Sequence, residues 1–370
     1  MEPKVIALYL PQFYPTPTNN KWWGIGHTEW RSVGKAKKLF PGHYQPRIPA
    51  DLGYYDLRIP EVREKQVELA KKAGIYGFCY YHYWFGNGHE ELELPFNEIV
   101  KSGKPDFPFM LCWANESWEK KFWDQNVKIQ DGKNSIILQQ TYPGKEDHIN
   151  HFYHFLPAFK DKRYIKINGR LAFMIYKPDD LPETSNFINL WQYLATTEGL
   201  PEFHFIAHVS SYIDKPKLNE YLKKGFKGVN TVGLGGARAK LENKFLRKTL
   251  QIYARKFYLP FNIEYKDIYP LFKTPVDNEK NVYPSLIPNW DHTPRSGKYG
   301  FLIHNSTPNY WREHIKDFFK IIKSKNENII FLKSWNEWGE GNYMEPDLKW
   351  GHQYIDILRE EIDNFKDNIS

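Results

Sequence analysis

Eight short apolar runs recur along this chain, and their repetition restricts the fold more than any other feature of the sequence. Each run is rich in β-branched and aromatic residues, which is the composition of a buried β-strand rather than of a loop. We therefore predict eight strands. They lie at residues 5–10, 76–84, 109–113, 171–176, 203–209, 228–232, 285–290 and 329–335.

The segments that separate and follow these runs have the apolar spacing of helices. In the first of them Val62, Val67 and Ala70 share one side, and Gly74 follows where a left-handed residue would end a helix. The segments lie at residues 61–73, 94–101, 146–159, 186–195, 217–224, 311–323 and 352–365. Strands that alternate with helices predict an α/β protein, and eight such units favour a (β/α)8 TIM barrel. The open doubly wound sheet is the alternative.

The length of 370 residues fits a single barrel that spans residues 1–370. Three long connections, at residues 13–57, 114–143 and 233–283, each follow a strand, so we expect long loops on the C-terminal face of the strands. The third predicts an insertion at about residues 233–283. Within it, residues 240–259 resemble a basic amphipathic helix, which we expect to pack against the barrel; peripheral contact with a membrane is the alternative.

The net charge limits the classes of binding partner, and the cysteines indicate the redox state of the compartment. The formal net charge of +7 allows an acidic partner such as a phospholipid surface, an anionic glycan or a nucleic acid. Because lysines are mixed with acidic residues and no basic arm is present, we expect no nucleic-acid partner. Cys79 and Cys112 fall in predicted buried strands, which predicts reduced thiols. Without a signal-like segment or an apolar run of membrane-spanning length, we expect a cytoplasmic protein, or a periplasmic one if a leader has been removed.

A cluster of acidic and aromatic residues follows the last apolar run. Residues 335–347 read Trp-Asn-Glu-Trp-Gly-Glu-Gly-Asn-Tyr-Met-Glu-Pro-Asp, which places Glu337, Glu340 and Glu345 among tryptophans and glycines. A sugar ring stacks on tryptophan, and cleavage of its acetal linkage needs one carboxyl that donates a proton and a second that acts as base or nucleophile. The segment therefore predicts a carbohydrate-active site at a strand end, and a solvated acidic turn is the alternative.

Polar and aromatic residues also follow the other predicted strands. Strand alternation puts Tyr81 and Tyr83 on one face and His82 and Trp84 on the other, and the sequence does not decide which face lines the barrel. For any single residue, packing or a satisfied hydrogen bond is an equally good explanation, but the shared position at strand ends favours substrate contact. The candidates for substrate binding are Tyr81, His82, Trp84, Trp113, Asn115, Glu116, Tyr176, His208, Trp290, Asp291, Asn336, Trp338, Tyr343 and Glu345.

Several familiar catalytic motifs do not occur in the sequence. His-Glu-x-x-His and Cys-x-x-Cys are absent, so we expect no metal, although ligands from separate strands escape such a search. We expect no cofactor. The sequence also lacks the Gly-x-Ser-x-Gly elbow of α/β-hydrolases and the Asp-x-Asp pair that metal-dependent nucleotide-sugar transferases commonly use.

Blocks from the first strand to the last resemble the WbsX-type family. They lie at residues 8–13, 22–30, 40–46, 77–84, 112–116, 288–291 and 335–346, and roughly residues 180–282 match weakly. That family is similar to glycoside hydrolase family 99, the endo-α-mannosidase and endo-mannanase group, which implies a (β/α)8 barrel and retaining cleavage of α-mannosidic bonds. By this resemblance Glu337 is the base that deprotonates the sugar 2-hydroxyl to give a 1,2-anhydro intermediate. Glu340 is the general acid that protonates the leaving oxygen.

The resemblance implies more than one function. We expect a glycoside hydrolase that cleaves an α-linked mannose-like glycan with retention, because the residues supply an acid and a base but no recognisable nucleotide-diphosphate site. WbsX-type proteins are often labelled glycosyltransferases, so a transferase in bacterial O-antigen or capsule biosynthesis is one alternative, and a non-catalytic glycan-binding protein is another. The expected partner is an oligosaccharide or polysaccharide. Residues 117–121 depart from the family's Asn-Trp-Thr-Arg-Arg, and the sugar, linkage, endo or exo action and oligomeric state stay open.

Overall fold

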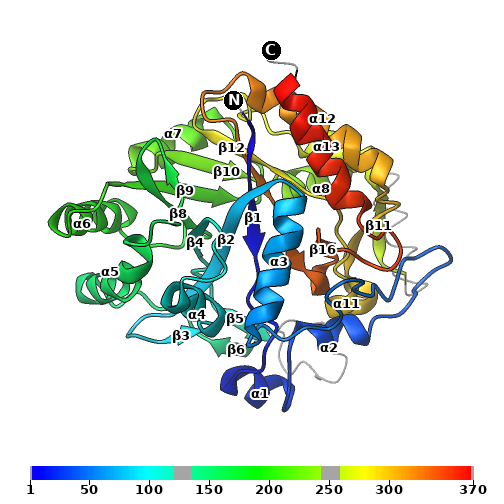
Figure 1. Ribbon diagram of the computed structural model, residues 1–370, viewed down its shortest axis with the longest axis horizontal. Helices are drawn as coiled ribbons and strands as arrows, with labels where there is room; N and C mark the ends of the chain where they lie inside the picture. The colour runs from blue at the N-terminus through cyan, green and yellow to red at the C-terminus, as the bar shows by residue number, and fades with distance from the viewer. Residues whose placement is uncertain (1, 121–134, 243–258, 368–370) are drawn as a thin grey trace.

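The computed structural model describes residues 2–120, 135–242 and 259–367 and shows eight parallel strands in a closed barrel (Figure 1). β1 (Lys4–Tyr9) pairs with both β2 (Ile75–Trp84) and β14 (Ile329–Leu332), and this double pairing closes the sheet on itself. The other barrel strands are β4 (Phe109–Trp113), β8 (Arg170–Ile175), β9 (Phe203–Val209), β10 (Gly228–Thr231) and β12 (Val282–Leu286). The strands follow one another around the barrel in chain order, which confirms the (β/α)8 prediction and excludes the open doubly wound sheet.

Each of the eight predicted runs overlaps a barrel strand, and the largest shift is in β12. This strand begins at Val282, whereas the sequence predicts a start at residue 285. The sequence pattern misses the first residues of β12 because of Pro284. Proline has no backbone N–H to donate to a neighbouring strand and is normally absent from central strands. Pro284 nevertheless sits opposite Thr231 of β10, and the pairing of β12 with β14 begins just after it, at Ser285. The barrel therefore accommodates the proline where only one neighbouring strand is paired.

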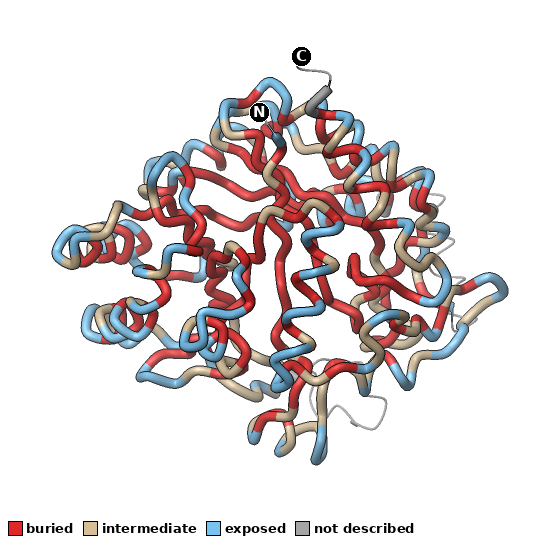
Figure 2. Tube along the Cα trace, viewed as in Figure 1, coloured by how far each residue is buried: buried red, intermediate tan, exposed pale blue. Residues whose placement is uncertain are grey.

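The main helices lie outside the barrel and turn one face toward it, so that their inner sides are buried and their outer sides exposed (Figures 1 and 2). Trp191 and Trp311, for example, are fully buried on the inner faces of two helices. These helices are α3 (Pro60–Lys72), α4 (Leu94–Ser102), α5 (Lys145–Phe159), α6 (Thr184–Thr197), α7 (Lys215–Lys223), α12 (Pro308–Lys323) and α13 (Gln353–Asp367). α12 starts earlier than predicted because the Thr307 hydroxyl caps it and Pro308 fits the first turn.

The connections contain shorter elements. The short helices are α1 (Pro17–Trp23), α2 (Glu29–Gly34), α8 (Leu234–Glu242), α10 (Tyr265–Ile268) and α11 (Thr293–Ser296), with 3-10 turns η1 (Tyr269–Phe272), η2 (Gly297–Tyr299) and η3 (Trp338–Glu340). The short strands are β3 (Glu90–Glu91), β5 (Trp118–Lys120), β6 (Ser135–Leu138), β7 (Lys166–Ile167), β11 (Phe261–Glu264), β13 (Phe301–His304), β15 (Asn336–Glu337) and β16 (Asn342–Tyr343).

Two expectations for the β10–β12 connection remain untested. The helix expected at residues 240–259 lies mostly outside the described residues, and the insertion expected at about residues 233–283 stays a prediction. Across the described part of the chain, every helix is too short or too polar to cross a bilayer.

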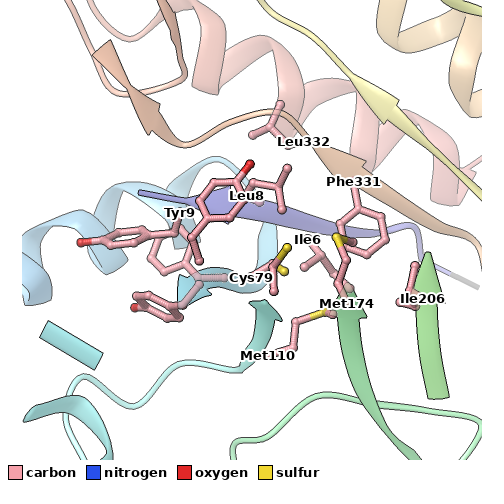
Figure 3. Packing of buried hydrophobic residues seen from close by; sticks show 14 of the residues in the cluster. Ile6, Leu8, Tyr9, Cys79, Met110, Met174, Ile206, Phe331 and Leu332 are labelled. Atoms are coloured by element: carbon pink, nitrogen blue, oxygen red, sulfur yellow. The ribbon is translucent and has the colours of Figure 1, made fainter. Parts of the chain in front are cut away.

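Alternate side chains of the strands fill the barrel interior, as Figure 3 shows for Ile6, Cys79, Met110 and Met174. Cys79 sits opposite Met110 on the neighbouring strand. Both cysteines of the chain are buried and carry free thiols, as predicted. Because side chains alternate along a strand, the next inward residues of β2 beyond Cys79 are Tyr81 and Tyr83. The packed interior therefore ends in polar aromatic side chains at the C-terminal end of the barrel.

Candidate active site

A cavity of about 1000 Å³ opens at the C-terminal end of the barrel, the end to which the β1 arrow points in Figure 1. Each barrel strand contributes lining residues at or after its C-terminal end. In strand order they are Leu10 and Gln12, Tyr81 and Tyr83, Ala114 and Glu116, Tyr176, Ser210, Val232, Trp290, and finally Lys333, Glu337 and Glu340. Barrel enzymes place their sites at this end, because side chains from several strands converge there.

Glu337 and Glu340 lie together in this cavity, as the sequence predicted. Glu337 ends β15 and Glu340 ends η3, and the tight turn between them brings both carboxyl groups to the same lining. Lys333 at the exit of β14 also points inward, and its Nζ lies 3.3 and 3.2 Å from the two oxygens of Glu337. Only 5% of Glu337 is exposed, so the carboxyl and the ammonium face each other away from bulk water.

Arg295 of α11 anchors the second carboxyl group. Its guanidinium donates to Glu340 from one nitrogen and to Glu29 from two others, at 3.0 and 2.7 Å. Glu29, on α2, is itself only 3% exposed. A Cβ at Gly339 would lie 1.7 Å from an oxygen of Glu29, so only glycine fits between the two glutamates of the turn. The glycine in Glu-Trp-Gly-Glu is therefore required by the close approach of Glu29.

The environment separates the acidities of the two carboxyl groups. Burial raises the pKa of Glu337 to about 7, against the pull of the Lys333 ammonium. Burial acts on Glu340 as well, but Arg295, His292 and Lys333 outweigh it, and they lower the pKa of Glu340 to about 2. A hydrogen bond between the two carboxyl groups adds to this effect. Below pH about 7 the pair thus holds one proton, carried by Glu337 and donated to the Glu340 carboxylate.

Aromatic residues form the inner wall beside this pair. Tyr81 and Tyr176 meet edge to face at 5.8 Å, and Tyr176 stacks on His208 at 4.7 Å. Tyr83 packs against Trp118 at 5.4 Å. The hydroxyl of Tyr81 is buried, and it has no hydrogen-bond partner among the described residues. Flat rings and an unpaired hydroxyl next to two carboxyl groups suit a sugar, which has both apolar faces and hydroxyl groups.

A buried network holds the glutamate-bearing turn from behind. Glu345 accepts hydrogen bonds from Trp338 Nε1 at 2.6 Å, Gln66 Nε2 at 2.7 Å and the Tyr55 hydroxyl at 3.0 Å. Asn336 accepts from the Leu10 backbone N–H at 2.8 Å and donates to its carbonyl at 3.0 Å. Burial raises the pKa of Glu345 to about 7 even with these donors. Glu345 therefore positions the turn rather than facing the cavity.

The structure brings six of the sequence-predicted site residues to the cavity lining: Tyr81, Glu116, Tyr176, Trp290, Glu337 and Glu340. Of the two faces of β2, the one that carries Tyr81 and Tyr83 lines the cavity. His82 and Trp84 face α5 instead, with His82 Nε2 2.9 Å from His151 Nε2 and Trp84 Nε1 donating to Asp147 at 3.1 Å.

The other predicted residues lie behind the lining and support it. Trp113 donates its indole N–H to the Trp84 carbonyl, and Asn115 accepts from the Lys177 backbone N–H. His208 lies beneath Tyr176, and Asp291 accepts from Gln45 Nε2 at 2.7 Å. The predicted residues that do not line the cavity are His82, Trp84, Trp113, Asn115, His208, Asp291, Asn336, Trp338, Tyr343 and Glu345.

Sequence reasoning missed the three charged residues that form ion pairs around the two glutamates: Lys333, Arg295 and Glu29. Lys333 had a usable signal, because it follows the inward-facing Phe331 by two positions, which is the period of a strand. Arg295 and Glu29 come from separate connections, and only the folded chain brings them together. As for metals, the described ranges contain no group of three or more His, Cys, Asp or Glu side chains arranged to hold an ion.

Comparison with known proteins gives two kinds of relatives. By sequence, the family described as "Glycosyltransferase WbsX" matches residues 5–358. Two proteins named "Uncharacterized protein WxcX", from two strains of Xanthomonas campestris pv. campestris, are each 30% identical to this chain, over 364 and 367 residues. The match covers 97% of this chain and 49% of theirs, so the chain spans about half the length of these curated relatives.

Structural likeness is to glycoside hydrolases. A protein described as "Glycoside hydrolase-like protein" superimposes with a TM-score of 0.61, at 14% identity, over 98% of this chain and 94% of its own. The family 99 endo-α-mannosidase from Bacteroides thetaiotaomicron superimposes with a TM-score of 0.57, also at 14% identity, over 98% of this chain and 97% of its own. At such identities the likeness shows a shared barrel fold and nothing further.

Proposed function

This chain belongs to the WbsX glycosyltransferase family, as its sequence resemblance predicted, and we propose that it is a glycoside hydrolase that cleaves α-linked mannose-like glycans with retention. One observation carries the proposal: the buried carboxyl group of Glu337 and the partly buried one of Glu340 share a hydrogen bond and line one cavity at the C-terminal end of a barrel, where their surroundings move their pKa values apart, to about 7 and about 2. Two carboxyl groups with such different acidities are what acid–base cleavage of an acetal requires.

The proposed reaction uses the sugar's own 2-hydroxyl as nucleophile. Glu337 removes the proton of that hydroxyl, and the oxygen attacks the anomeric carbon as the bond to the leaving oxygen breaks. Glu340 gives its proton to the leaving oxygen. Water then opens the 1,2-anhydro sugar, with Glu340 taking a proton from the water and Glu337 returning one to the 2-oxygen. Both carboxyl groups end as they began.

These roles require the shared proton to move. The raised pKa of Glu337 and the lowered pKa of Glu340 place the proton on Glu337, whereas the reaction starts with Glu337 ionised and Glu340 protonated. The hydrogen bond between the two groups provides the path for this transfer. A substrate that replaces Arg295 as the hydrogen-bond partner of Glu340 would shift the balance in the needed direction, because Arg295 lowers the pKa of Glu340. Tyr81, with its unpaired hydroxyl, supplies one further donor to the bound sugar.

Screening defined glycans and analysing products by mass spectrometry tests the proposal. We expect the wild-type protein to release a reducing-end fragment from α-linked mannose oligosaccharides, and Glu340→Gln to release far less. Binding without any product from the whole panel, together with unchanged affinity in Glu337→Gln, would instead support a glycan-binding protein. Retention is checked by NMR of the first-formed anomer.

A glycosyltransferase of surface-polysaccharide assembly is the second candidate, favoured by the description of the family itself. It predicts that a nucleotide sugar binds in the same cavity and is consumed only when an acceptor glycan is present. Calorimetry with a panel of nucleotide sugars separates the two functions, because a hydrolase of glycans has no need to bind the nucleotide.

A further inference from the structure

One wall of the cavity differs in charge from the rest. This wall, here called the α1–α2 wall, consists of Asn19, Trp23, His27, Arg31, Ser32 and Lys35, together with Glu29, whose charge is matched by Arg295. α2 packs against η3, which holds Glu340, and against α11, which holds Arg295. The wall therefore adjoins the carboxyl pair and is in reach of a group on the same bound glycan.

The charges of the cavity balance in total but not locally. Its lining contains five basic residues, Arg31, Lys35, Arg238, Arg295 and Lys333, and five acidic ones, Glu29, Glu116, Glu119, Glu337 and Glu340. Near the carboxyl pair each charge is matched, since Lys333 faces Glu337 and Arg295 holds both Glu29 and Glu340. No carboxylate of the described residues lies within ion-pair distance of Arg31 or Lys35. The α1–α2 wall thus presents two uncompensated cations.

Arg31 is fixed in place although its side chain is exposed. One of its terminal nitrogens donates to the Trp23 carbonyl. The guanidinium has further N–H groups that this hydrogen bond does not occupy. The guanidinium also lies against Gly24, where a Cβ would come to 3.0 Å from Arg31 Nη1. A cation held in this way loses little side-chain freedom when an anion binds, which favours recognition over a purely solvating role.

Two buried polar atoms of the same wall have no partner among the described residues: Nδ2 of Asn19 and Nδ1 of His27. Asn19 is only 1% exposed, and its side-chain amide is a donor that would be satisfied by an oxygen in the cavity. Burial and the cations Arg31, Lys35 and Arg295 lower the pKa of His27 to about 4, so His27 is neutral and adds no competing charge. The Asn19 amide, which lacks an acceptor in the described part of the chain, therefore lies on the same wall as Arg31 and Lys35, which lack an anionic partner there.

We propose that the α1–α2 wall is a subsite for an anionic group, the carboxylate or phosphate of an acidic glycan, with Arg31 and Lys35 as its charged contacts. The proposal rests on the proposed function, because it names the class of substrate that the carboxyl pair acts on. It also makes use of the basic character that the net charge of +7 suggested. A neutral glycan would leave both cations without an anionic partner and would supply no charge to this wall.

Matched ligands test the subsite directly by calorimetry. The probes are a neutral α-linked mannose oligosaccharide, the same compound oxidised at C6 to the carboxylate, the C6 phosphate, and GDP-mannose as a nucleotide sugar. We expect wild-type protein to bind an acidic probe about tenfold more tightly than the neutral one, which is the scale of two partly exposed charge contacts. The preference should shrink between 50 and 500 mM salt, since exposed charges are screened (roughly 14 to 4 Å Debye length).

The variant Arg31→Gln/Lys35→Gln removes both charges, and we expect its preference for the acidic probe to fall to near one. The control Lys101→Gln/Lys166→Gln lowers the net charge equally at exposed positions outside the cavity and should keep the preference. Circular dichroism confirms folding of each. Equal binding of acidic and neutral probes by the wild type, or a preference that survives in Arg31→Gln/Lys35→Gln, would overturn the subsite.

Product analysis with the same probes separates this inference from the proposed function. A charge preference that depends on Arg31 and Lys35, without cleavage of any probe, supports the subsite and refutes hydrolysis. Cleavage of neutral and acidic probes at equal rates, with no effect of the double variant, supports hydrolysis and refutes the subsite. Tight binding of GDP-mannose alone, lost in the double variant, supports the subsite with a phosphate as the anion and favours the transferase.

Discussion

Glu337 and Glu340 are three positions apart and share a proton, yet the proposed reaction gives them different tasks. We expect Glu337→Gln and Glu340→Gln each to lower turnover of an unactivated α-linked glycan by about 10²–10⁴-fold, the range of general acid–base catalysis. An aryl glycoside with an acidic phenol needs no proton on its leaving oxygen. On that substrate Glu340→Gln should regain most of its activity, whereas Glu337→Gln should not, because the 2-hydroxyl still needs its base. Steady-state kinetics with both substrates measures this, and the opposite pattern would exchange the two roles.

Lys333 sets the pH range over which the pair holds its proton. The proposed reaction starts with one proton on the pair, so kcat/KM should fall as the pH rises through about 7, where Glu337 and Glu340 together lose it. The Lys333 ammonium lowers the pKa of Glu337, so Lys333→Met should raise that pKa and move this alkaline limb to higher pH. Lys325→Met is the matched control, since Lys325 is equally buried but lies outside the cavity. A limb that stays in place in Lys333→Met would contradict the assignment.

At the scale of elements, the connection from β14 to α13 carries both catalytic candidates, and Glu345 holds it in place. Gln in place of Glu345 substitutes a donor for one acceptor oxygen, which leaves at least one buried donor unsatisfied, at a cost of about 1–3 kcal/mol. At pH 8, above the pKa of about 7 of Glu345, we expect Glu345→Gln to lose that stability and also turnover, because Trp338 adjoins Glu337. Glu361→Gln, which removes the charge from a partly buried ion pair with Arg312 outside the site, should lose stability alone. Urea unfolding and kcat/KM separate the two effects, and equal turnover in both variants would remove Glu345 from the positioning network.

The same connection shows how far sequence reasoning reaches at this scale. The apolar run before it and the spacing Glu-Trp-Gly-Glu were enough to predict a strand that ends in two cavity-facing carboxyl groups. The roles of Trp338 and Glu345 could not be predicted, because a residue that lines a cavity and one that supports the lining have the same local pattern. Glu345 is identified as a supporting residue only by its hydrogen bonds with Gln66 and Tyr55, which lie far away in the chain.

For the molecule as a whole, the eightfold repeat of strand and helix was sufficient to predict the barrel, because eight right-handed units leave few other arrangements. The long connections were harder. Arg295 and Glu29 reach the site from α11 and α2, which have no periodicity to announce them, and their ion pair is visible only once the barrel has closed. Sequence pattern thus specifies the scaffold, whereas the electrostatics of the site depend on contacts between distant loops.

Buried titratable groups are numerous enough to make the stability of the whole molecule depend on pH. Burial lowers the pKa of several histidines far below 6.5, so these side chains stay neutral in the folded chain while they become charged in the unfolded one. They are His82, His151, His204, His208 and His314. Their contribution to stability is complete above pH about 6.5 and is lost as the pH falls. Glu337 and Glu345 act in the opposite direction. Their pKa values are raised to about 7 in the folded chain, so the folded state gains stability over the unfolded one as the pH falls from about 7 toward about 4.5.

The sign of the net effect follows from the number of groups on each side. Each fully titrating group changes the free energy of unfolding by about 1.4 kcal/mol per pH unit, and these five histidines outnumber Glu337 and Glu345, the two carboxyl groups with the largest upward shifts. We therefore expect the free energy of unfolding to be lower at pH 5.5 than at pH 7.5, by roughly 2–4 kcal/mol. Urea titrations at the two pH values measure the difference, and calorimetry in buffers of different ionisation enthalpy should show net proton uptake on unfolding near pH 6. Greater stability at pH 5.5, or proton release there, would mean that the buried carboxyl groups rather than the histidines dominate the response of this barrel to acid.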